Sequence, residues 1–411
     1  MSNIEIIQTS KFKNNTISLV IPVEMDDSVT GYNVLTEVLK RGTKSFKTSS
    51  EISRYLQDMY GGIFDIGVRK IGDKLFIMFY ISFLDHRFTL NKENLFEKAV
   101  YLLNELILDP LFVRDDFDDE IIEQVIMSHR LYIESVYDDK AHYSMQRVLE
   151  IGLEDSYKIP DHGTLTELDK VTKESLVTLW ESLKKKHAYC YVSGNLENEE
   201  EVIKEISKLE ILKNPENGES LSSRGKRLFN RENKEIYEKM KINQGKMSLL
   251  YNTNTSIFHG DYFALVVFNS IFGGGAHSKL FNEVREKHSL AYSIYSTYDK
   301  FAGVLTVGGG IDFKNFTKTK DLIDEELLKM VHGDITDEEM TMAKTKVISS
   351  LKSMEDSMYN TSNYLIALRV FGIPYSIDDV IKGVWEVTKE RVMQVAKGIE
   401  FIAAHYLDGE V

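Results

Sequence analysis

Apolar residues along the chain follow two different spacings. Short apolar runs such as 17–23 (ISLVIPV) and 74–84 (KLFIMFYISFL) carry β-branched and aromatic side chains, which is typical of buried strands. They are much shorter than the roughly 20 apolar residues that a membrane-spanning helix needs. Longer segments with an apolar residue every three or four positions predict amphipathic helices. The pattern predicts buried strands with helices packed on them, and no association with a membrane.

The second part of the chain repeats the first. The tetrad VTKE at 171–174 returns at 387–390, and both copies place a threonine where a helix N-cap belongs. In both places an apolar-periodic helix follows and runs into a short strand, at 187–193 and at 401–407. A repeat of this kind indicates that one structural plan is used twice.

The segments before each tetrad have the same order. The first half predicts a strand at 17–23, helices at 29–40 and about 49–60, strands near 63–70 and 74–84, and helices within 93–108 and 116–135. The second half predicts a strand at 247–252, helices at 260–271 and 277–287, strands near 291–299 and 303–310, and helices within 314–331 and 336–356. The two halves therefore share one succession of elements.

This succession predicts an α+β fold with two related halves, each a mostly antiparallel sheet with helices packed on one face. We expect an N-terminal half at 1–210 and a C-terminal half at 236–411. Between them, 211–235 is charged, contains Ser and Gly and has little apolar periodicity, so we expect an exposed linker. At 411 residues the chain is long enough for two cores.

Charge and cysteine content narrow the functional classes. The formal net charge of −14 disfavours nucleic-acid binding, which needs clustered Lys and Arg. Cys190 is the single cysteine, so the chain can form neither an internal disulfide nor a cysteine-based zinc cluster. The first residues are polar and lack the pattern of a secretory signal. We expect a cytoplasmic protein.

The most specific local motif is 272–292, FGGGAHSKLFNEVREKHSLAY. It predicts a glycine-rich bend at Gly273, Gly274 and Gly275, a short amphipathic helix, and a turn into a strand. The motif resembles the second-half signature of the insulinase, pitrilysin and mitochondrial processing-peptidase family. The resemblance extends over nearly the whole chain and includes RGTKSFKTSSEISRYLQDMYGG (41–62) and INQGKMSLLY (242–251). The string 133–147 further resembles inactive-type members from Gram-positive bacteria.

The resemblance implies a duplicated fold in which two such units close around a chamber. Active members carry the zinc motif H-x-x-E-H just before a Gly-Thr pair, which here is Gly42-Thr43. Two imidazoles one helical turn apart bind the metal, and the glutamate takes a proton from the zinc-bound water. Counting back from the Gly-Thr pair gives the five residues Asn33, Val34, Leu35, Thr36 and Glu37, so neither histidine is present.

The rest of the sequence does not restore this motif. None of the ten histidines has a second histidine four positions away. Ser128 and His129 stand about where the family has its further glutamate ligand. A degenerate site of Asn33, Glu37 and His129 would offer zinc one imidazole and one carboxylate, which is a poor ligand set. Because the ligand set is poor, we expect no metal in this chain. Thr36, at the position of the catalytic glutamate, cannot act as the general base.

The second half keeps what the first half has lost. In active members an arginine and a tyrosine seven residues apart reach the zinc site of a facing first half, where they bind the substrate backbone and stabilise the oxyanion. Arg285 and Tyr292 have this spacing. Without the family motif, the same two residues would be interpreted as a solvated helix residue and a packed strand residue.

The leading hypothesis is a non-catalytic, substrate-binding subunit of a heterodimeric zinc peptidase that cleaves short or unfolded peptides. The zinc would be held by a partner chain with the complete motif, and this chain would supply Arg285 and Tyr292. One alternative is a catalytically silent homodimer that binds peptides or serves as a scaffold. A second alternative is an unconventional peptidase that acts alone through Glu37 and His129.

Overall fold

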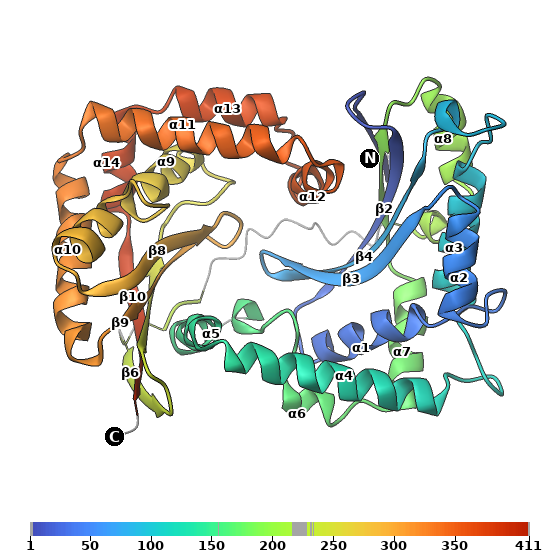
Figure 1. The fold of residues 1–411 in the computed structure, drawn as a ribbon, viewed down its shortest axis with the longest axis horizontal. Helices are drawn as coiled ribbons and strands as arrows, with labels where there is room; N and C mark the ends of the chain where they lie inside the picture. Colours follow the sequence, from blue (N-terminus) through green and yellow to red (C-terminus); the bar gives the residue numbers. More distant parts are fainter. Residues whose placement is uncertain (1–2, 155, 216–227, 231, 233, 410–411) are drawn as a thin grey trace. The chain divides into compact units, whose positions relative to one another are not determined.

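Strands and helices fill the chain in the expected order (Figure 1). The computed structural model describes residues 3–409 apart from 155, 216–227, 231 and 233. The first half contains β1 (Ile4–Gln8), β2 (Asn14–Glu24), α1 (Val29–Leu39), α2 (Ser49–Gln57), β3 (Ile63–Ile71), β4 (Lys74–Leu84), α3 (Phe96–Leu108), α4 (Asp119–Asp138), α5 (Lys140–Gly152), α6 (Leu165–Leu168), α7 (Lys173–Lys184), β5 (Tyr189–Gly194) and α8 (Glu199–Ile206). The second half contains β6 (Lys234–Met240), β7 (Gly245–Asn252), α9 (Tyr262–Phe272), the π-helix Phe281–Lys287, β8 (Ala291–Asp299), β9 (Val304–Ile311), α10 (Phe316–His332), α11 (Asp337–Met354), α12 (Met358–Arg369), α13 (Ile377–Trp385), α14 (Lys389–Lys397) and β10 (Glu400–Gly409).

The described strands form two five-stranded sheets with one topology. Their strand orders are β1-β5-β2-β4-β3 and β6-β10-β7-β9-β8. In each sheet the first strand pairs in parallel with the last, and the other pairings are antiparallel. The predicted α+β fold with two related halves is therefore confirmed.

The chain forms two compact units that are not continuous in sequence. Unit 1 comprises 1–134, 159–221 and 356–372, and unit 2 comprises 135–158, 222–355 and 373–411. Helix α5, from the first half of the sequence, belongs to unit 2, and helix α12, from the second half, belongs to unit 1. The boundaries at 210 and 236 were expected from the sequence repeat. They describe the two halves of the sequence, not the two compact units, and they stay a prediction.

Both faces of the unit 2 sheet are covered by helices. Ala403 on β10 packs with Val148 of α5 in one apolar cluster, whereas the Tyr406 ring meets Phe316 at the start of α10. Because successive strand residues point to opposite faces, α5 and α10 lie on opposite sides of the sheet. The predicted helices on one face are present, and α5 adds a helix on the other face.

A buried polar cluster ties α5 to the unit 2 sheet. The Ser144 hydroxyl lies 2.9 Å from Ser248 Oγ on β7 and 2.9 Å from His405 Nδ1 on β10. On the other side of the imidazole, Nε2 lies 3.4 Å from Glu238 Oε2 on β6. Arg147 of α5 donates to Glu238 at 2.7 and 3.0 Å. One helix is thus bonded to three strands.

Unit 1 follows the same plan, with α12 in the place of α5. Ser362 of α12 bonds to Ser193 of β5 at 2.8 Å, and the Tyr359 ring stands edge-on to Tyr80 of β4. On the opposite face Phe83 of β4 packs edge-on against Phe96 of α3. Each sheet is therefore covered on one face by a helix from the other half of the sequence.

The repeated tetrad forms the N-caps that its threonines predicted. Thr172 Oγ1 accepts the backbone N–H of Ser175 at the start of α7, and Thr388 Oγ1 accepts that of Arg391 at the start of α14. Cys190 is fully buried on β5, and burial raises the pKa of its thiol, so it is a core residue rather than a nucleophile.

Two edge strands, β1 and β6, were not predicted. β6 begins at Lys234, inside the segment expected to be a linker, and two charged residues stand on each side of the adjacent Ile236 and Tyr237. At the start of that segment Ile211 and Leu212 are buried. Most of the remaining linker lies outside the described residues.

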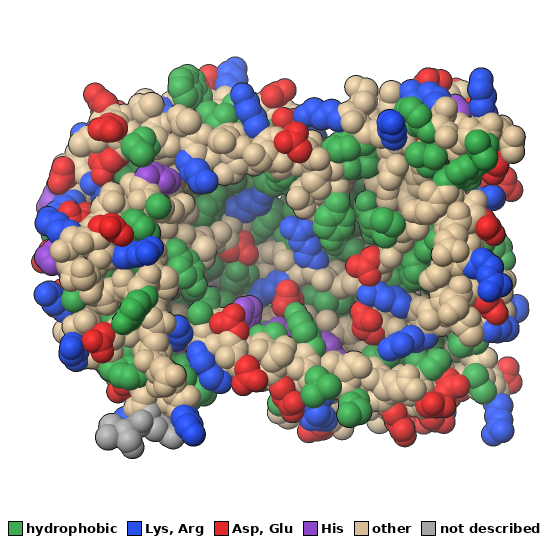
Figure 2. All heavy atoms as spheres, in the orientation of Figure 1, with side chains coloured by type: hydrophobic (Ala, Val, Ile, Leu, Met, Phe, Trp, Pro, Cys, Tyr) green, Lys and Arg blue, Asp and Glu red, His purple; other side chains and the backbone are tan. Residues whose placement is uncertain are grey.

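The face of the molecule shown in Figure 2 carries charges of both signs. Acidic and basic side chains are intermixed over the face shown in Figure 2. Among the described residues, no helix combines the length and the apolar composition needed to cross a bilayer.

Candidate functional site

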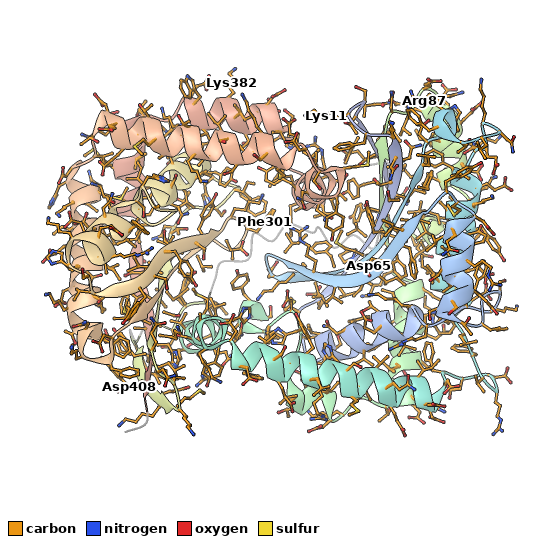
Figure 3. The ribbon with its side chains drawn as sticks, viewed as in Figure 1. Lys11, Asp65, Arg87, Phe301, Lys382 and Asp408 are labelled. Atoms are coloured by element: carbon orange, nitrogen blue, oxygen red, sulfur yellow. The ribbon has the colours of Figure 1, made fainter. Side chains whose placement is uncertain are left out.

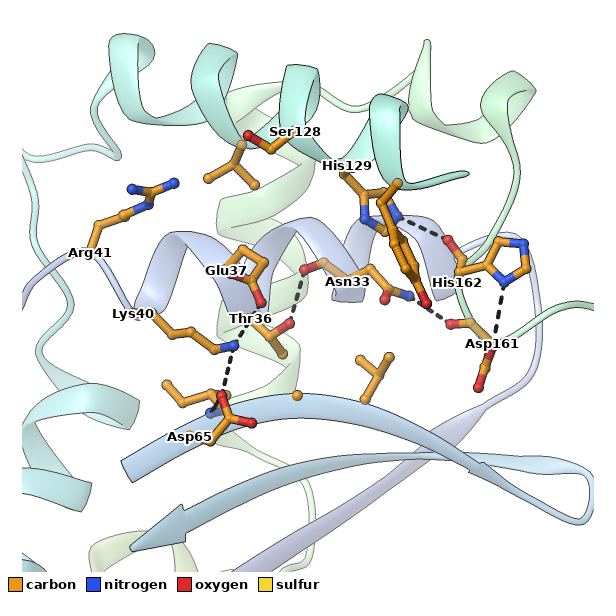
Figure 4. A pocket seen from close by; sticks show the side chains of 15 residues that line it. Asn33, Thr36, Glu37, Lys40, Arg41, Asp65, Ser128, His129, Asp161 and His162 are labelled. Atoms are coloured by element: carbon orange, nitrogen blue, oxygen red, sulfur yellow. Dashed lines mark hydrogen bonds and ion pairs between the residues drawn. The ribbon is translucent and has the colours of Figure 1, made fainter. Parts of the chain in front are cut away.

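The positions where the sequence predicts a lost zinc motif line a pocket in unit 1 (Figure 4). Its volume is about 420 Å³. Helices α1 and α4, the edge strand β3 and the loop before α6 supply its walls. The polar residues that line it are Asn33, Thr36, Glu37, Lys40, Arg41, Asp65, Ser128, His129, Tyr132, Asp161 and His162. All four predicted positions, Asn33, Thr36, Glu37 and His129, are brought together here.

Helix α1 presents its polar residues to the pocket because positions three and four apart share one helix face. Asn33 Nδ2 donates to the Val29 carbonyl at 2.9 Å and to the Asp161 carbonyl at 2.8 Å. Thr36 Oγ1 donates to the Asn33 carbonyl at 2.9 Å. Both side chains thus bond to backbone oxygens, and Asn33 ties α1 to the loop before α6.

A lysine holds two carboxylates at one end of the pocket. Lys40 Nζ lies 2.7 Å from Glu37 Oε1 and 2.8 Å from Oδ1 of Asp65, which stands on β3 (Figure 3). Burial by itself lowers the pKa of Lys40, but the hydrogen bonds to Asp65 and Glu37 outweigh it, and the pKa is raised. Lys40 therefore remains an ammonium ion beside the position of the second lost histidine.

His129 points into the pocket from α4 and is 7% exposed. Its Nε2 lies 2.9 Å from the carbonyl oxygen of His162. A carbonyl only accepts, so Nε2 carries the proton and Nδ1 is the free acceptor of the neutral ring. Burial lowers the pKa of His129, which favours this neutral form.

These residues do not fit a catalytic zinc ion. Within the described ranges, no group of three or more His, Cys, Asp and Glu side chains is placed to hold a metal. The Glu37 carboxylate is paired with Lys40, and the Nε2 of His129 is committed to a carbonyl. Zinc sites need three or four converging nitrogen, sulfur or oxygen ligands. No zinc-dependent step can therefore be assigned to this pocket.

Arg285 lies in unit 2 on irregular backbone. It belongs to the π-helix Phe281–Lys287, a helix type that recurs at functional sites. Its side chain is 44% exposed, and its nearest carboxylate is that of the adjacent Glu286, at 3.7 Å. The guanidinium also lies over the Phe281 ring, 4.7 Å from its centre. Arg285 is thus positioned by weak local contacts.

Tyr292 occupies a β-bulge at the start of β8. Ala291 pairs with Ile311 and Ser293 with Gly310, so Tyr292 is the extra residue between two successive pairs. Its side chain is 72% exposed. Tyr292 is therefore not a packed strand residue, and its side chain is accessible to a ligand or a partner chain.

The glycine-rich loop has a structural role. The backbone N–H of Ser296 on β8 donates to the Gly273 carbonyl at 2.9 Å. A Cβ on Gly273 would lie 2.6 Å from that nitrogen, and one on Gly274 would lie 2.7 Å from the Cα of Ser270. Gly275 has a φ of +153°. As predicted, close backbone approach requires glycine here, and the loop is bonded to the edge of β8.

Several pocket residues were not found from the sequence. Lys40 and Arg41 precede the Gly-Thr pair and could have been noticed from their place one turn after the lost motif. Asp65, Asp161 and His162 carry no local signal, because folding alone brings β3 and the loop before α6 to α1.

Comparisons with known proteins agree with this structure. Residues 170–347 match the family described as "Peptidase M16 inactive domain". The "Probable inactive metalloprotease YmfF" of Bacillus subtilis (strain 168) is 30% identical over 409 residues, covering 98% of this chain and 95% of that protein. The chain therefore belongs to the M16 peptidase family, and the resemblance noted from its motifs is confirmed.

Solved structures share the fold over the whole chain. A conserved protein from Enterococcus faecalis V583 has a TM-score of 0.90 and 27% identity, covering 99% of this chain and 96% of that one. The peptidase M16 inactive domain from Pseudomonas fluorescens has a TM-score of 0.79 and 16% identity, covering 99% and 96%. The second likeness concerns the fold alone.

Proposed function

We propose that this chain is the non-catalytic subunit of a zinc-dependent peptidase and supplies Arg285 and Tyr292 to the zinc site of a partner chain. The observation that carries the proposal is that both side chains are exposed, one on a π-helix and one on a β-bulge, and that no described residue forms a strong bond that competes for them. M16 family chains often pair with one another.

The two side chains suit the chemistry of peptide-bond hydrolysis. Arginine offers a rigid fork of N–H donors and tyrosine one hydroxyl, and such donors stabilise the negative oxygen that develops on the attacked carbonyl. The zinc and the activated water would belong to a partner that carries H-x-x-E-H. The pocket of this chain lacks a fitting ligand set, which is consistent with this division of labour.

We propose that the substrates are short or unfolded peptides. Such peptides can adopt the extended backbone that adds to a free strand edge. The proposed compartment is the cytoplasm. This is supported by the lone, fully buried Cys190, since a disulfide framework is typical of exported proteins.

The test is a reconstitution with an M16 chain that carries the complete zinc motif, taken from the same genome. We expect the mixture to cleave an unstructured, fluorogenic peptide, and Arg285→Ala to lower kcat/KM by about 100- to 1,000-fold, as for the loss of an oxyanion donor. Tyr292→Phe removes only the hydroxyl and should also lower kcat/KM for peptide cleavage, because it removes a second donor to the oxyanion.

Two matched variants serve as controls. Lys287→Ala removes a cation from the same π-helix, where Lys287 is paired with Glu283. Tyr237→Phe removes an exposed hydroxyl from β6, the edge strand on the opposite side of the same sheet. Both should leave cleavage unchanged. An active mixture that tolerates Arg285→Ala would refute the proposed role, and a mixture without activity would favour the silent homodimer. Zinc uptake and cleavage by this chain alone would favour the independent peptidase.

A further inference from the structure

The pocket contains one cation that is not used by its neighbours. Arg41 is half-buried and its guanidinium is directed into the pocket (Figure 4). Among the described residues, no carboxylate lies within 4.0 Å of it, whereas the adjacent Lys40 binds both Glu37 and Asp65. A guanidinium held beside a cavity without an anion is a ready binding group for a carboxylate, which it can hold through two parallel N–H···O bonds.

The surrounding charges select a small, singly charged anion. Glu37 and Asp65 share the charge of Lys40, and the Asp161 carboxylate lies 3.5 Å from His162 Nδ1. A phosphate or another multiply charged group would approach these three carboxylates and be repelled by them. A single carboxylate at Arg41 carries only one negative charge, so the three carboxylates repel it less than they repel a multiply charged group.

The pocket also has a wall that suits a peptide chain. Residues 65–68 of β3 line it, and β3 is the last strand of its sheet, paired with β4 alone. A free strand edge offers backbone N–H and C=O groups to an extended peptide. Ser128 and the unprotonated Nδ1 of His129 add a hydroxyl and an acceptor. About 420 Å³ is within the usual range for a ligand pocket.

We propose that this pocket binds the C-terminal carboxylate of a short peptide, with Arg41 as the carboxylate-binding residue and the peptide backbone along β3. The place of the lost zinc site would then recognise a chain end instead of an internal peptide bond. This inference rests on the peptide-binding part of the proposed function and does not depend on the pairing with a zinc-bearing chain.

The test compares two forms of one peptide on the purified full-length chain. The probe is a seven-residue peptide of Ala, Leu and Ser with an N-terminal fluorescein, made with a free C-terminal carboxylate or with a carboxamide. Fluorescence anisotropy should show that the carboxylate form binds about 10- to 100-fold more tightly, as expected when a hydrogen-bonded ion pair is lost. In Arg41→Gln the two forms should bind equally weakly.

The matched control is Arg54→Gln, an exposed arginine on α2 outside the pocket, which should keep the preference. Thermal melting checks that Arg41→Gln is folded. Equal binding of the two forms, or an intact preference in Arg41→Gln, would overturn the inference and leave the Arg285 experiment untouched. Acetate is the singly charged small-molecule competitor. If it displaces the peptide at a concentration equal to the peptide's own Kd, the ligand is a small carboxylate rather than a peptide end, and the inference is overturned. Failure of both forms to bind would overturn the inference together with the peptide-binding part of the proposed function, while cleavage by the mixture remains a separate result.

Discussion

The ammonium of Lys40 lies 2.7 Å from the carboxylate of Glu37, which the sequence predicts to stand at the position of the second zinc-binding histidine. A fixed positive charge therefore stands beside a site that active members reserve for a metal ion. The backbone of α1 at this site is regular, and Asn33, Thr36 and Glu37 all face the same pocket. If the predicted motif positions are correct, the metal site was lost by a change of side chains on an intact helix.

This geometry predicts that zinc binding can be restored. We expect the triple variant Asn33→His, Thr36→Glu and Glu37→His, combined with Ser128→Glu on α4, to take up about one zinc ion per chain, because positions 33 and 37 are one turn apart and face α4. Elemental analysis after dialysis measures the bound metal. The unaltered chain, and a variant with Asn33→His alone, should bind far less. Equal zinc content in all three would show that α1 and α4 do not converge as described.

Gly273 should be intolerant of any side chain. A Cβ there would lie 2.5 Å from Ser296 Oγ and 2.6 Å from its backbone nitrogen, so Gly273→Ala should lower the free energy of unfolding by about 1–3 kcal/mol. Urea denaturation measures the change. Gly260→Ala, near the other end of α9, meets nothing within 4 Å and should have little effect. Similar losses in both variants would contradict a steric cause.

The Thr43 hydroxyl should contribute through a buried carboxylate. Thr43 is fully buried, and its Oγ1 donates to Glu105 Oε2 at 2.9 Å. Thr43→Val keeps the shape but removes this donor, so the free energy of unfolding should fall by about 1–3 kcal/mol. Thr178→Val, on the exposed face of α7, should change it by less than about 0.5 kcal/mol. Equal stability of Thr43→Val and the unaltered chain would mean that Glu105 is satisfied without the hydroxyl.

The buried cluster on α5 should make stability depend on pH. Burial lowers the pKa of His405 below that of an exposed histidine, although the charge of Glu238 opposes this shift. As the pH falls below about 6.5, the unfolded chain takes up a proton that folded His405 does not, so stability is lost. Between pH 7 and 5.5 the free energy of unfolding should fall, and this group can contribute at most about 1 kcal/mol to the loss.

Replacing the imidazole tests this dependence. In His405→Gln the decline of stability between pH 7 and 5.5 should be shallower, as measured by urea denaturation at each pH, whatever the variant's stability at pH 7. His332→Gln, which is exposed at the end of α10, should keep the original slope. An unchanged slope in His405→Gln would assign the acid sensitivity to other groups. Below about pH 4.5 the protonation of Glu238 adds a further loss, because hydrogen bonds from Tyr143 and Arg147 outweigh its burial and lower its pKa.

The fold was largely predictable because its strands are long and apolar. The run 74–84 coincides with β4, and 17–23 lies within β2. The strand β6 could not be predicted, because its lysines and glutamates make an edge strand similar to a charged linker. The placement of α5 and α12 could not be predicted either, because an amphipathic pattern predicts a helix but not the sheet on which it packs.

Only those residues of the candidate site that belong to the family motif could be predicted from the sequence. The motif located Asn33, Thr36 and Glu37, and the structure places them in one pocket with His129. It could not reveal that Lys40 bridges Glu37 to Asp65, because Asp65 is brought there by the pairing of β3 with β4. The exposure of Arg285 and Tyr292 follows from a π-helix and a bulge, which depend on local backbone geometry and have no simple sequence signal.

The membership of α5 and α12 has a consequence for the two sequence halves as separate polypeptides. If the chain were divided between β5 and β6, the N-terminal fragment would still carry the helix that closes the second sheet, and the C-terminal fragment would carry the one that closes the first. Neither fragment could bury its own sheet by itself, and the divided protein would hold together as an interlocked pair without a peptide bond between its parts.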